Sequence, residues 1–199
     1  MIEFFYSIDK TLFYFCNQTL SNPVFDFIMP PITDWNQSWV GISLSILLII
    51  LLLWKGGKKG RVVVALLIPL IILSDQVSSN FIKSLVARPR PCHIINGIQV
   101  LDNIHLIVPC GAGYSFPSSH AVNNFAFATL ISYFYPRIKW LVFSYACLMG
   151  FSRIYVGVHY PSDVIGGALL GIIYAIFIIL IYKHFFNNLI PIDVKGKDV

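Results

Sequence analysis

The sequence predicts an all-α fold: a polytopic bundle of about five transmembrane spans, preceded by N-terminal interfacial helices. The first observation is composition, because 57% of the 199 residues are hydrophobic and only 12% are charged. A soluble domain of this size carries about 25% charged residues, so this chain cannot cover a water-facing surface. The second is the grouping of apolar residues into helix-length stretches, and the third is the uneven placement of Lys and Arg between those stretches. We therefore expect one integral-membrane domain over residues 1–199.

Residues 1–36 are expected to form short helices that lie in the membrane interface. Their apolar face is broad but is interrupted by Asp9 and Lys10, and it comprises Phe4, Phe5, Ile8, Leu12, Phe13 and Phe15. Pro23 and the pair Pro30-Pro31 are expected to break any long helix here. A sixth span is the less favoured alternative for this segment.

Five apolar stretches make up the expected bundle over residues 37–185. They are Trp39–Trp54, Val62 to about Ile82, His120–Tyr135, Trp140–Ile154 and Val164–Tyr182. Residues 136–139 are short enough to join two antiparallel helices, whereas residues 83–118 form a long loop. Trp39, Trp54 and Trp140 stand at the ends of stretches, as interfacial aromatic residues do.

The basic residues predict which end of the bundle faces the cytoplasm. With five spans, nine of the fourteen Lys and Arg residues fall on one side, namely Lys55, Lys58, Lys59, Arg61, Arg137, Lys139, Lys183, Lys195 and Lys197. The positive-inside rule makes that side cytoplasmic, including the tail 186–199. The remaining basic residues lie near the opposite end and point to a site on the outer, periplasmic face of a bacterial inner membrane.

Three segments far apart in the sequence should meet on that outer side. The first carries Lys83, Arg88 and Arg90, the second is Pro117-Ser118-Ser119-His120, and the third runs from Ser152-Arg153 through His159 to Asp163. Cations, hydroxyls and free amides at helix starts together favour an anion, because the helix dipole adds to the positive potential. Arg also fits phosphate oxygens with two parallel hydrogen bonds. The cluster therefore predicts a phosphate site.

Two histidines and one aspartate in this cluster predict reactivity as well as binding. Asp163 can accept a hydrogen bond from His159 Nδ1, which leaves Nε2 free to act as a nucleophile. His120 can then protonate the departing oxygen. A two-metal phosphatase would need several carboxylates near the site, and none stands in ligand-like spacing. We expect no metal and no cofactor.

These residues carry a family resemblance. Lys83 with Arg90-Pro91, then Pro117-Ser118-Ser119-His120, then Ser152-Arg153 with His159 and Asp163 together resemble the three motifs of the type 2 phosphatidic acid phosphatase superfamily, which includes the haloperoxidases. The resemblance implies a phosphatase/haloperoxidase-like core with His159 as nucleophile, Asp163 as its orienting partner and His120 as general acid. It implies that Lys83, Arg90, Ser118, the backbone at Ser119, and Arg153 hold the phosphate. Ser119 stands where the family motif usually has Gly, which allows a closer backbone approach.

The resemblance implies a membrane lipid phosphatase that works through a phosphohistidine. Among its substrates, undecaprenyl diphosphate is slightly favoured by the small size of the chain, ahead of phosphatidylglycerol phosphate, phosphatidate and lipid A phosphates. The alternative is a non-enzymatic protein that binds or transports an anion or phospholipid. A haloperoxidase is disfavoured because those proteins are soluble. No nucleic-acid motif is present, and the sequence leaves the oligomeric state open.

Several further residues carry separate expectations. Arg88 is interpreted as a headgroup contact, and Asp75 as a structural partner of another span. Gly166, Gly167 and Gly171 are expected to allow close helix packing.

Cys92 and Cys110 flank the outer loop, and an oxidising periplasm would allow them to form a disulfide. Two free, unrelated cysteines are the alternative. Cys16 and Cys147 are interpreted as apolar fillers.

Overall fold

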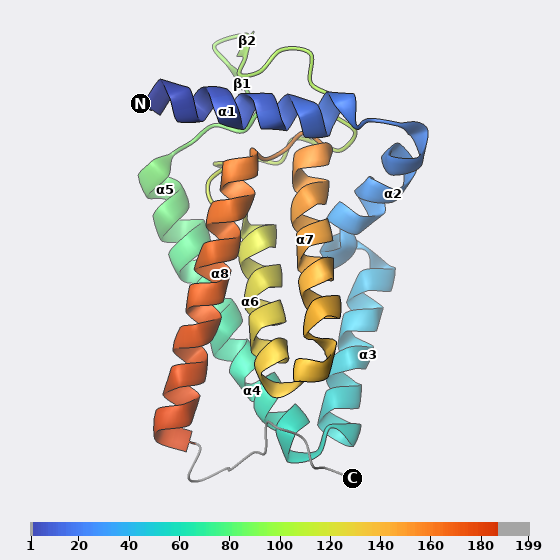
Figure 1. Ribbon diagram of the computed structural model, residues 1–199, viewed down its shortest axis with the longest axis vertical. Coiled ribbons are helices and arrows are strands. Elements are labelled where there is room, and N and C mark those ends of the chain that lie inside the picture. The colour runs from blue at the N-terminus through green and yellow to red at the C-terminus, as the bar shows by residue number, and fades with distance from the viewer. Residues whose placement is uncertain (1, 187–199) are drawn as a thin grey trace.

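The computed structural model describes residues 2–186 as a mostly helical protein (Figure 1). The α-helices are α1 (Ile2–Tyr14), α2 (Pro23–Thr33), α3 (Trp39–Lys55), α4 (Gly57–Ser74), α5 (Lys83–Val86), α6 (Ser119–Phe134), α7 (Lys139–Tyr155) and α8 (Pro161–Ile181). π-Helical segments cover Phe15–Thr19, Asp75–Ile82 and Tyr182–Phe186, and 3₁₀ turns cover Trp35–Gln37 and Pro136–Ile138. All but the first residue of the tail predicted over 186–199 lie outside the described residues.

All five expected apolar stretches are helical and run roughly alongside one another (Figure 1). Gly57–Val86 and Pro161–Phe186 are long and apolar enough to cross a membrane, while Trp39–Lys55 is apolar but shorter. The number of crossings therefore stays a prediction. The α3–α4 and α6–α7 connections lie together at one end of the bundle, so the basic turns around Lys58 and Arg137 share that end.

The core forms where α6 packs against α4, α7 and α8. Its largest buried side chains include Leu70, Leu130 and Phe134. Helices α6 and α8 approach closely because of Gly167 and Gly171: a Cβ atom at these positions would lie 2.7 Å from Ser118 O and 2.2 Å from Val122 O. The predicted packing role of these two glycines is confirmed.

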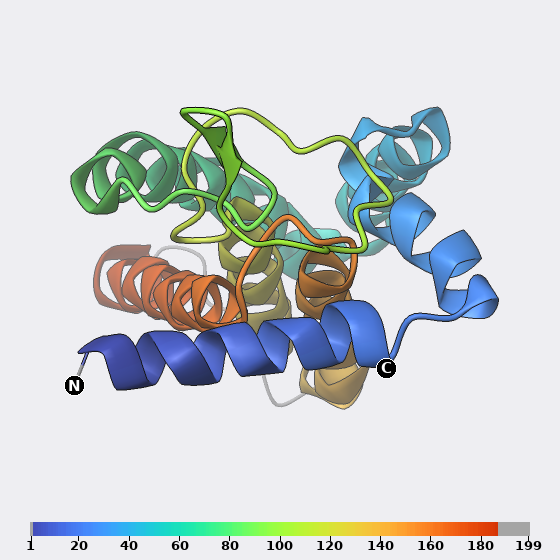
Figure 2. The same cartoon turned by 90° about the horizontal axis from the view of Figure 1, so that it is seen from above.

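Helix α1 lies across the other end of the bundle, nearly perpendicular to α6, α7 and α8, and α2 runs down beside α7 (Figures 1 and 2). The chain is tied here by buried Asn17, whose Nδ2 donates to Tyr155 O at 2.7 Å and to His105 O at 2.8 Å. Asn17 Oδ1 also accepts from His105 N at 2.8 Å. One side chain therefore joins the N-terminal segment to α7 and to the outer loop.

The N-terminal segment forms short helices rather than one long helix, as expected, but α2 does not end at Pro30-Pro31. Helix α2 begins where predicted, because Asn22 Oδ1 accepts from Val24 N and Phe25 N at 3.0 Å and Pro23 fits the first helical position. It continues through both prolines to Thr33. The prolines fall near the end of an 11-residue helix, so few backbone hydrogen bonds are lost.

The expected pairing of Asp75 with another span is also wrong. Asp75 is exposed and has no hydrogen-bond or ion-pair partner among residues 2–186. It begins the π-helical segment, in which Ser78 instead faces inward and donates to Tyr174 Oη at 3.2 Å, while the preceding Ser74 bonds to Asn123. Leu70, Ser74 and Ser78 form the buried face of this helix, and Asp75 lies outside it.

The outer loop is closed by the predicted disulfide between Cys92 and Cys110, with 5.9 Å between their Cα atoms. Within it, β1 (Ile94–Ile95) and β2 (Ile98–Gln99) pair antiparallel around Asn96 and Gly97, whose φ angles of 52° and 81° suit a tight hairpin turn. Cys16 and Cys147 are free. The loop covers the same end of the bundle as α1 (Figure 2).

Candidate active site

All three chemistry-bearing segments reach the end of the bundle that α1 and the outer loop cover. The end of α5, the start of α6, the end of α7 and the start of α8 lie together there (Figure 1). This end is opposite the basic turns that join α3 to α4 and α6 to α7. The convergence expected from the sequence is therefore present.

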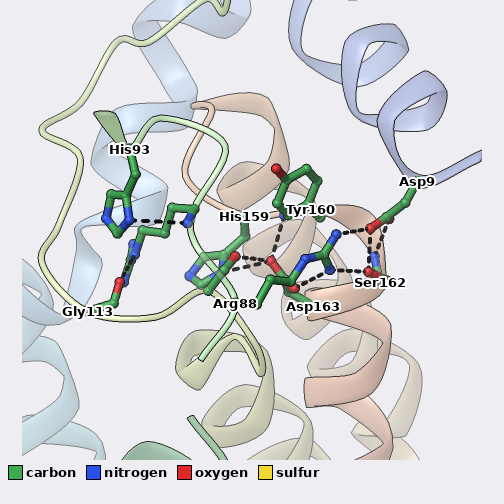
Figure 3. A network of polar contacts seen from close by, with 10 residues as sticks. Asp9, Arg88, His93, Gly113, His159, Tyr160, Ser162 and Asp163 are labelled. Carbon is green, nitrogen blue, oxygen red and sulfur yellow. Dashed lines mark hydrogen bonds and ion pairs between the residues drawn. The ribbon is translucent and has the colours of Figure 1, made fainter. Parts of the chain in front are cut away.

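His159 and Asp163 form the buried centre of the site (Figure 3). His159 lies in the turn between α7 and α8 and is 1% exposed, and Asp163 in the first turn of α8 is fully buried. His159 Nδ1 lies 3.4 Å from Asp163 Oδ2. The same oxygen accepts from Tyr160 N at 2.8 Å and from Ser115 Oγ. The carboxylate is thus held in one orientation, with Oδ2 facing the imidazole.

Burial determines the charge of His159. It lowers the pKa of His159 to about 4, against a smaller opposing effect of the hydrogen bond and charge of Asp163. The imidazole is therefore neutral near pH 7, and a neutral imidazole is the nucleophilic form.

His120 comes from the second residue of α6 and is partly buried. It interacts electrostatically with His159, Arg153, Lys83 and Arg90. The two imidazoles therefore share one environment, together with the cations predicted to hold phosphate.

The cations surround the imidazoles from three elements. Lys83 interacts electrostatically with Arg90, Arg153 and Asp163. Arg90 is buried, and its Nε donates to Gly113 O at 3.2 Å; burial lowers its pKa. Its backbone N–H donates to His93 Nδ1 at 3.3 Å, so His93 helps to order this loop.

Two buried donors of the site have no partner among residues 2–186. One is Arg153 Nε; the Nη1 atom of the same side chain donates to Thr33 Oγ1 at 2.9 Å. The other is Ser118 Oγ, just before the first turn of α6. Buried donors without acceptors are costly, so their presence suits a site that takes up an anion.

Ser119 uses its hydroxyl elsewhere. Ser119 Oγ lies 3.1 Å from Ser79 Oγ, a contact that ties α6 to the π-helical segment. Ser118 N donates to Asp163 O at 3.0 Å, so the starts of α6 and α8 are joined directly.

Sequence reasoning missed three residues of the site, namely Asp9, Thr33 and Ser115, and gave Arg88 the wrong role. The interpretation of Arg88 as a headgroup contact is wrong, because its Nη1 and Nη2 atoms lie 2.8 Å from Asp163 and 2.6 Å from Asp9. An Asp on the apolar face of α1 was a usable signal, because a charge there needs a partner. Nothing in the sequence distinguished Ser115 or Thr33 from other hydroxyl residues.

Comparisons with known proteins identify the family. The sequence pattern of the PAP2 superfamily matches residues 62–187. The chain is 34% identical to a lipid A 4'-phosphatase of Bacteroides thetaiotaomicron over 86% of this chain and 75% of the relative. It is 30% identical to the undecaprenyl-diphosphatase BcrC of Bacillus subtilis over 76% of this chain and 72% of the relative. The crystal structure of Aquifex aeolicus LpxE superposes with a TM-score of 0.70 at 32% identity, covering 87% of this chain and 95% of that one.

These relatives distinguish an enzyme from a non-enzymatic protein, but they do not identify the lipid substrate. Two of them are named as phosphatases of different lipids, which supports hydrolysis over non-enzymatic binding or transport. They do not support the slight preference for undecaprenyl diphosphate that chain size suggested. Because the family pattern spans most of the bundle and the buried centre lies within it, the chain belongs to the PAP2 superfamily and is a lipid phosphatase.

Proposed function

We propose that this protein removes a phosphate group from a lipid through a phosphohistidine intermediate on His159, without a metal ion. The observation that carries the proposal is a pair of buried donors, Ser118 Oγ and Arg153 Nε, that have no partner within the described part of the chain, together with a neutral, buried imidazole. The donors would bind the oxygens of a phosphoryl group. The imidazole would attack its phosphorus.

The reaction would proceed in two steps. His159 Nε2 attacks phosphorus while His120 donates a proton to the departing lipid oxygen, so the P–O bond breaks as the P–N bond forms. Water then attacks the phosphohistidine, His120 accepts its proton, and phosphate leaves. Asp163 keeps His159 in the required orientation throughout.

Charge stabilisation would come from the surrounding cations and amides. Phosphoryl transfer depends mainly on positioning and on neutralising the three equatorial oxygens. Lys83, Arg90 and Arg153 supply positive charge, and Ser118 with the backbone amide of Ser119 supplies neutral donors. Ser119 in place of the usual Gly leaves that amide available.

For the substrate, we propose a phosphomonoester of lipid A type. This choice is supported by the 34% identity to a lipid A 4'-phosphatase. We place the site on the periplasmic face of a bacterial inner membrane, because the basic turns lie at the opposite end of the bundle and basic turns favour the cytoplasm. In this arrangement α1 and α2 would lie in the outer interface.

The test is phosphate release by the purified protein in detergent with EDTA. The panel comprises lipid A, undecaprenyl diphosphate, phosphatidylglycerol phosphate and phosphatidate. We expect turnover with EDTA present, fastest with lipid A, and inhibition by vanadate. Faster turnover of another lipid would overturn the substrate choice alone.

Variants test the mechanism separately. His159→Gln should abolish turnover and His120→Gln should nearly do so, whereas His184→Gln is the matched control because His184 is exposed at the far end of α8. Brief reaction of the wild type with ³²P-labelled lipid, followed by alkaline quenching, should leave label on the protein. Full turnover by His159→Gln would contradict the mechanism.

A further inference from the structure

Arg88 lies between two carboxylates that come from opposite ends of the sequence (Figure 3). Its Nη1 atom donates to Asp163 Oδ1 at 2.8 Å and to Ser162 Oγ at 2.6 Å. Its Nη2 atom donates to Asp9 Oδ2 at 2.6 Å. The guanidinium also stacks on the ring of Tyr160, with its central carbon 3.8 Å from the ring centroid. The side chain is therefore fixed on both edges and on one face.

The bond to Arg88 engages the oxygen of Asp163 that does not face His159, and so helps to fix the orientation of the carboxylate. Oδ1 is taken by Arg88, and Oδ2 faces the imidazole and accepts from Tyr160 N and Ser115 Oγ. Asp163 is fully buried, so its carboxylate cannot obtain compensation from water. Without Arg88, Oδ1 would lose its charged donor, and the carboxylate would be held only through Oδ2 among the described contacts.

Asp9 holds the other side of this arrangement and belongs to α1. Its side chain is almost fully buried, and Oδ1 accepts from Ser162 N at 2.8 Å while Oδ2 accepts from Ser162 Oγ at 2.5 Å. Ser162 N is one of the free amides in the first turn of α8, so Asp9 satisfies it and complements the helix dipole. One carboxylate thus joins α1, Arg88 and the helix that carries Asp163.

Most of the described side chains of α1 are exposed. Phe4 and Phe5 are 65% and 63% exposed, and Leu12 is 47% exposed. Asp9, in contrast, is almost fully buried. The docked position of α1 therefore determines where the Asp9 carboxylate lies.

We propose that Asp9 and Arg88 are positioning residues of the hydrolysis: α1, through Asp9, fixes Arg88, and Arg88 fixes Asp163 so that Oδ2 faces His159. The inference rests on the proposed function, in which His159 attacks phosphorus and Asp163 orients it. Neither Asp9 nor Arg88 needs to touch the substrate. A disturbance of α1 should therefore slow phosphorylation of His159 while substrate binding persists.

The first experiment separates positioning from binding. Asp9→Asn keeps the shape and one acceptor but loses the charge, and Arg88→Lys keeps the charge but cannot reach Asp9, Ser162 and Asp163 together. Each should lower the rate of phosphohistidine formation in a single turnover by about tenfold or more, with KM nearly unchanged. Glu3→Gln, an exposed acid on the same helix, and Arg61→Lys, an exposed residue at the far end, are the matched controls. Unchanged rates in both test variants, or an increase in KM alone, would overturn the inference.

A double-mutant cycle tests whether Asp9 acts through Arg88. Asp9→Asn should cost about tenfold in the wild-type background but less than about twofold when Arg88 is already Gln. Equal losses in both backgrounds would show that α1 acts by another route and would overturn the inference. If Arg88→Gln does not fold, as judged by thermal unfolding, Arg88→Lys takes its place in the cycle with the same criteria.

These experiments distinguish failure of the positioning role from failure of the proposed function. If His159→Gln is inactive while the Asp9 and Arg88 variants behave as wild type, only the positioning role is refuted. If His159→Gln keeps turnover, the proposed function itself is refuted.

Discussion

Replacing Gly171 by Ala tests whether the separation of α6 and α8 determines catalysis. The added Cβ would lie 2.2 Å from Val122 O and 2.9 Å from Ala126 N, both backbone atoms of α6. No side-chain rotation can relieve a contact with backbone. An ordinary contact therefore requires the two helices to move apart by about 1 Å.

That displacement should affect activity more than stability. Overpacking costs about 1–3 kcal/mol, but Ala in place of Gly within a helix returns about 1 kcal/mol. The unfolding temperature should therefore change little. A 1 Å misplacement of reacting groups costs about 100-fold in rate, and α6 carries His120 whereas α8 carries Asp163.

The assay is phosphate release in detergent beside thermal unfolding of the same preparation. We expect kcat/KM to fall by about 10- to 100-fold with the fold retained. Leu169→Ala is the control, because Leu169 lies on α8 and is 58% exposed. Wild-type kcat/KM in Gly171→Ala would refute the idea that this helix contact sets the site geometry.

Three further predictions follow from the described contacts. Because burial lowers the pKa of His159 from 6.5 to about 4, the folded protein binds fewer protons than the unfolded chain between these values. The contribution of His159 to stability is therefore present above pH 6.5 and is lost as the pH falls toward 4. The decrease in unfolding temperature from pH 7 to pH 4.5 should accordingly be smaller in His159→Gln than in the wild type. The double variant Cys92→Ala/Cys110→Ala should lose about 3 kcal/mol of stability and most of its kcat, measured by unfolding and phosphate release, whereas a reductant should have no further effect on it. Asn17→Ala should leave Tyr155 O without its buried donor and expose the N-terminal segment, so limited proteolysis before residue 36 should accelerate; an unchanged cleavage rate would refute this role.

The helices were predictable because each is encoded locally. The stretch Trp39–Trp54 and the hairpin at 136–139 appear within a residue or two of their expected bounds. Their hydrophobic periodicity and the turn residues at their ends can be recognised without knowledge of distant contacts. The position of Asp75 could not be predicted in this way, because the packing of the helix against its neighbours decides which face is buried.

The same distinction between local and long-range information applies to the residues of the site. His120, His159 and Asp163 stand in motifs of fixed spacing, so the sequence identifies them as candidates. The bond between Asp9 and Arg88 spans 79 residues and depends on the angle at which α1 docks, which no local pattern encodes. An interfacial helix was expected at this position, but its contribution to the buried charges was not.

The Cys92–Cys110 disulfide makes the sidedness of the protein chemically measurable. It lies beside the phosphate cluster in the chain: Arg90 precedes Cys92 by two residues, and Gly113, which accepts the hydrogen bond from Arg90, follows Cys110 by three. The bridge and the phosphate cluster must therefore share one compartment. Oxidation of this cysteine pair in cells would reveal which membrane face the enzyme serves, even before its substrate is known.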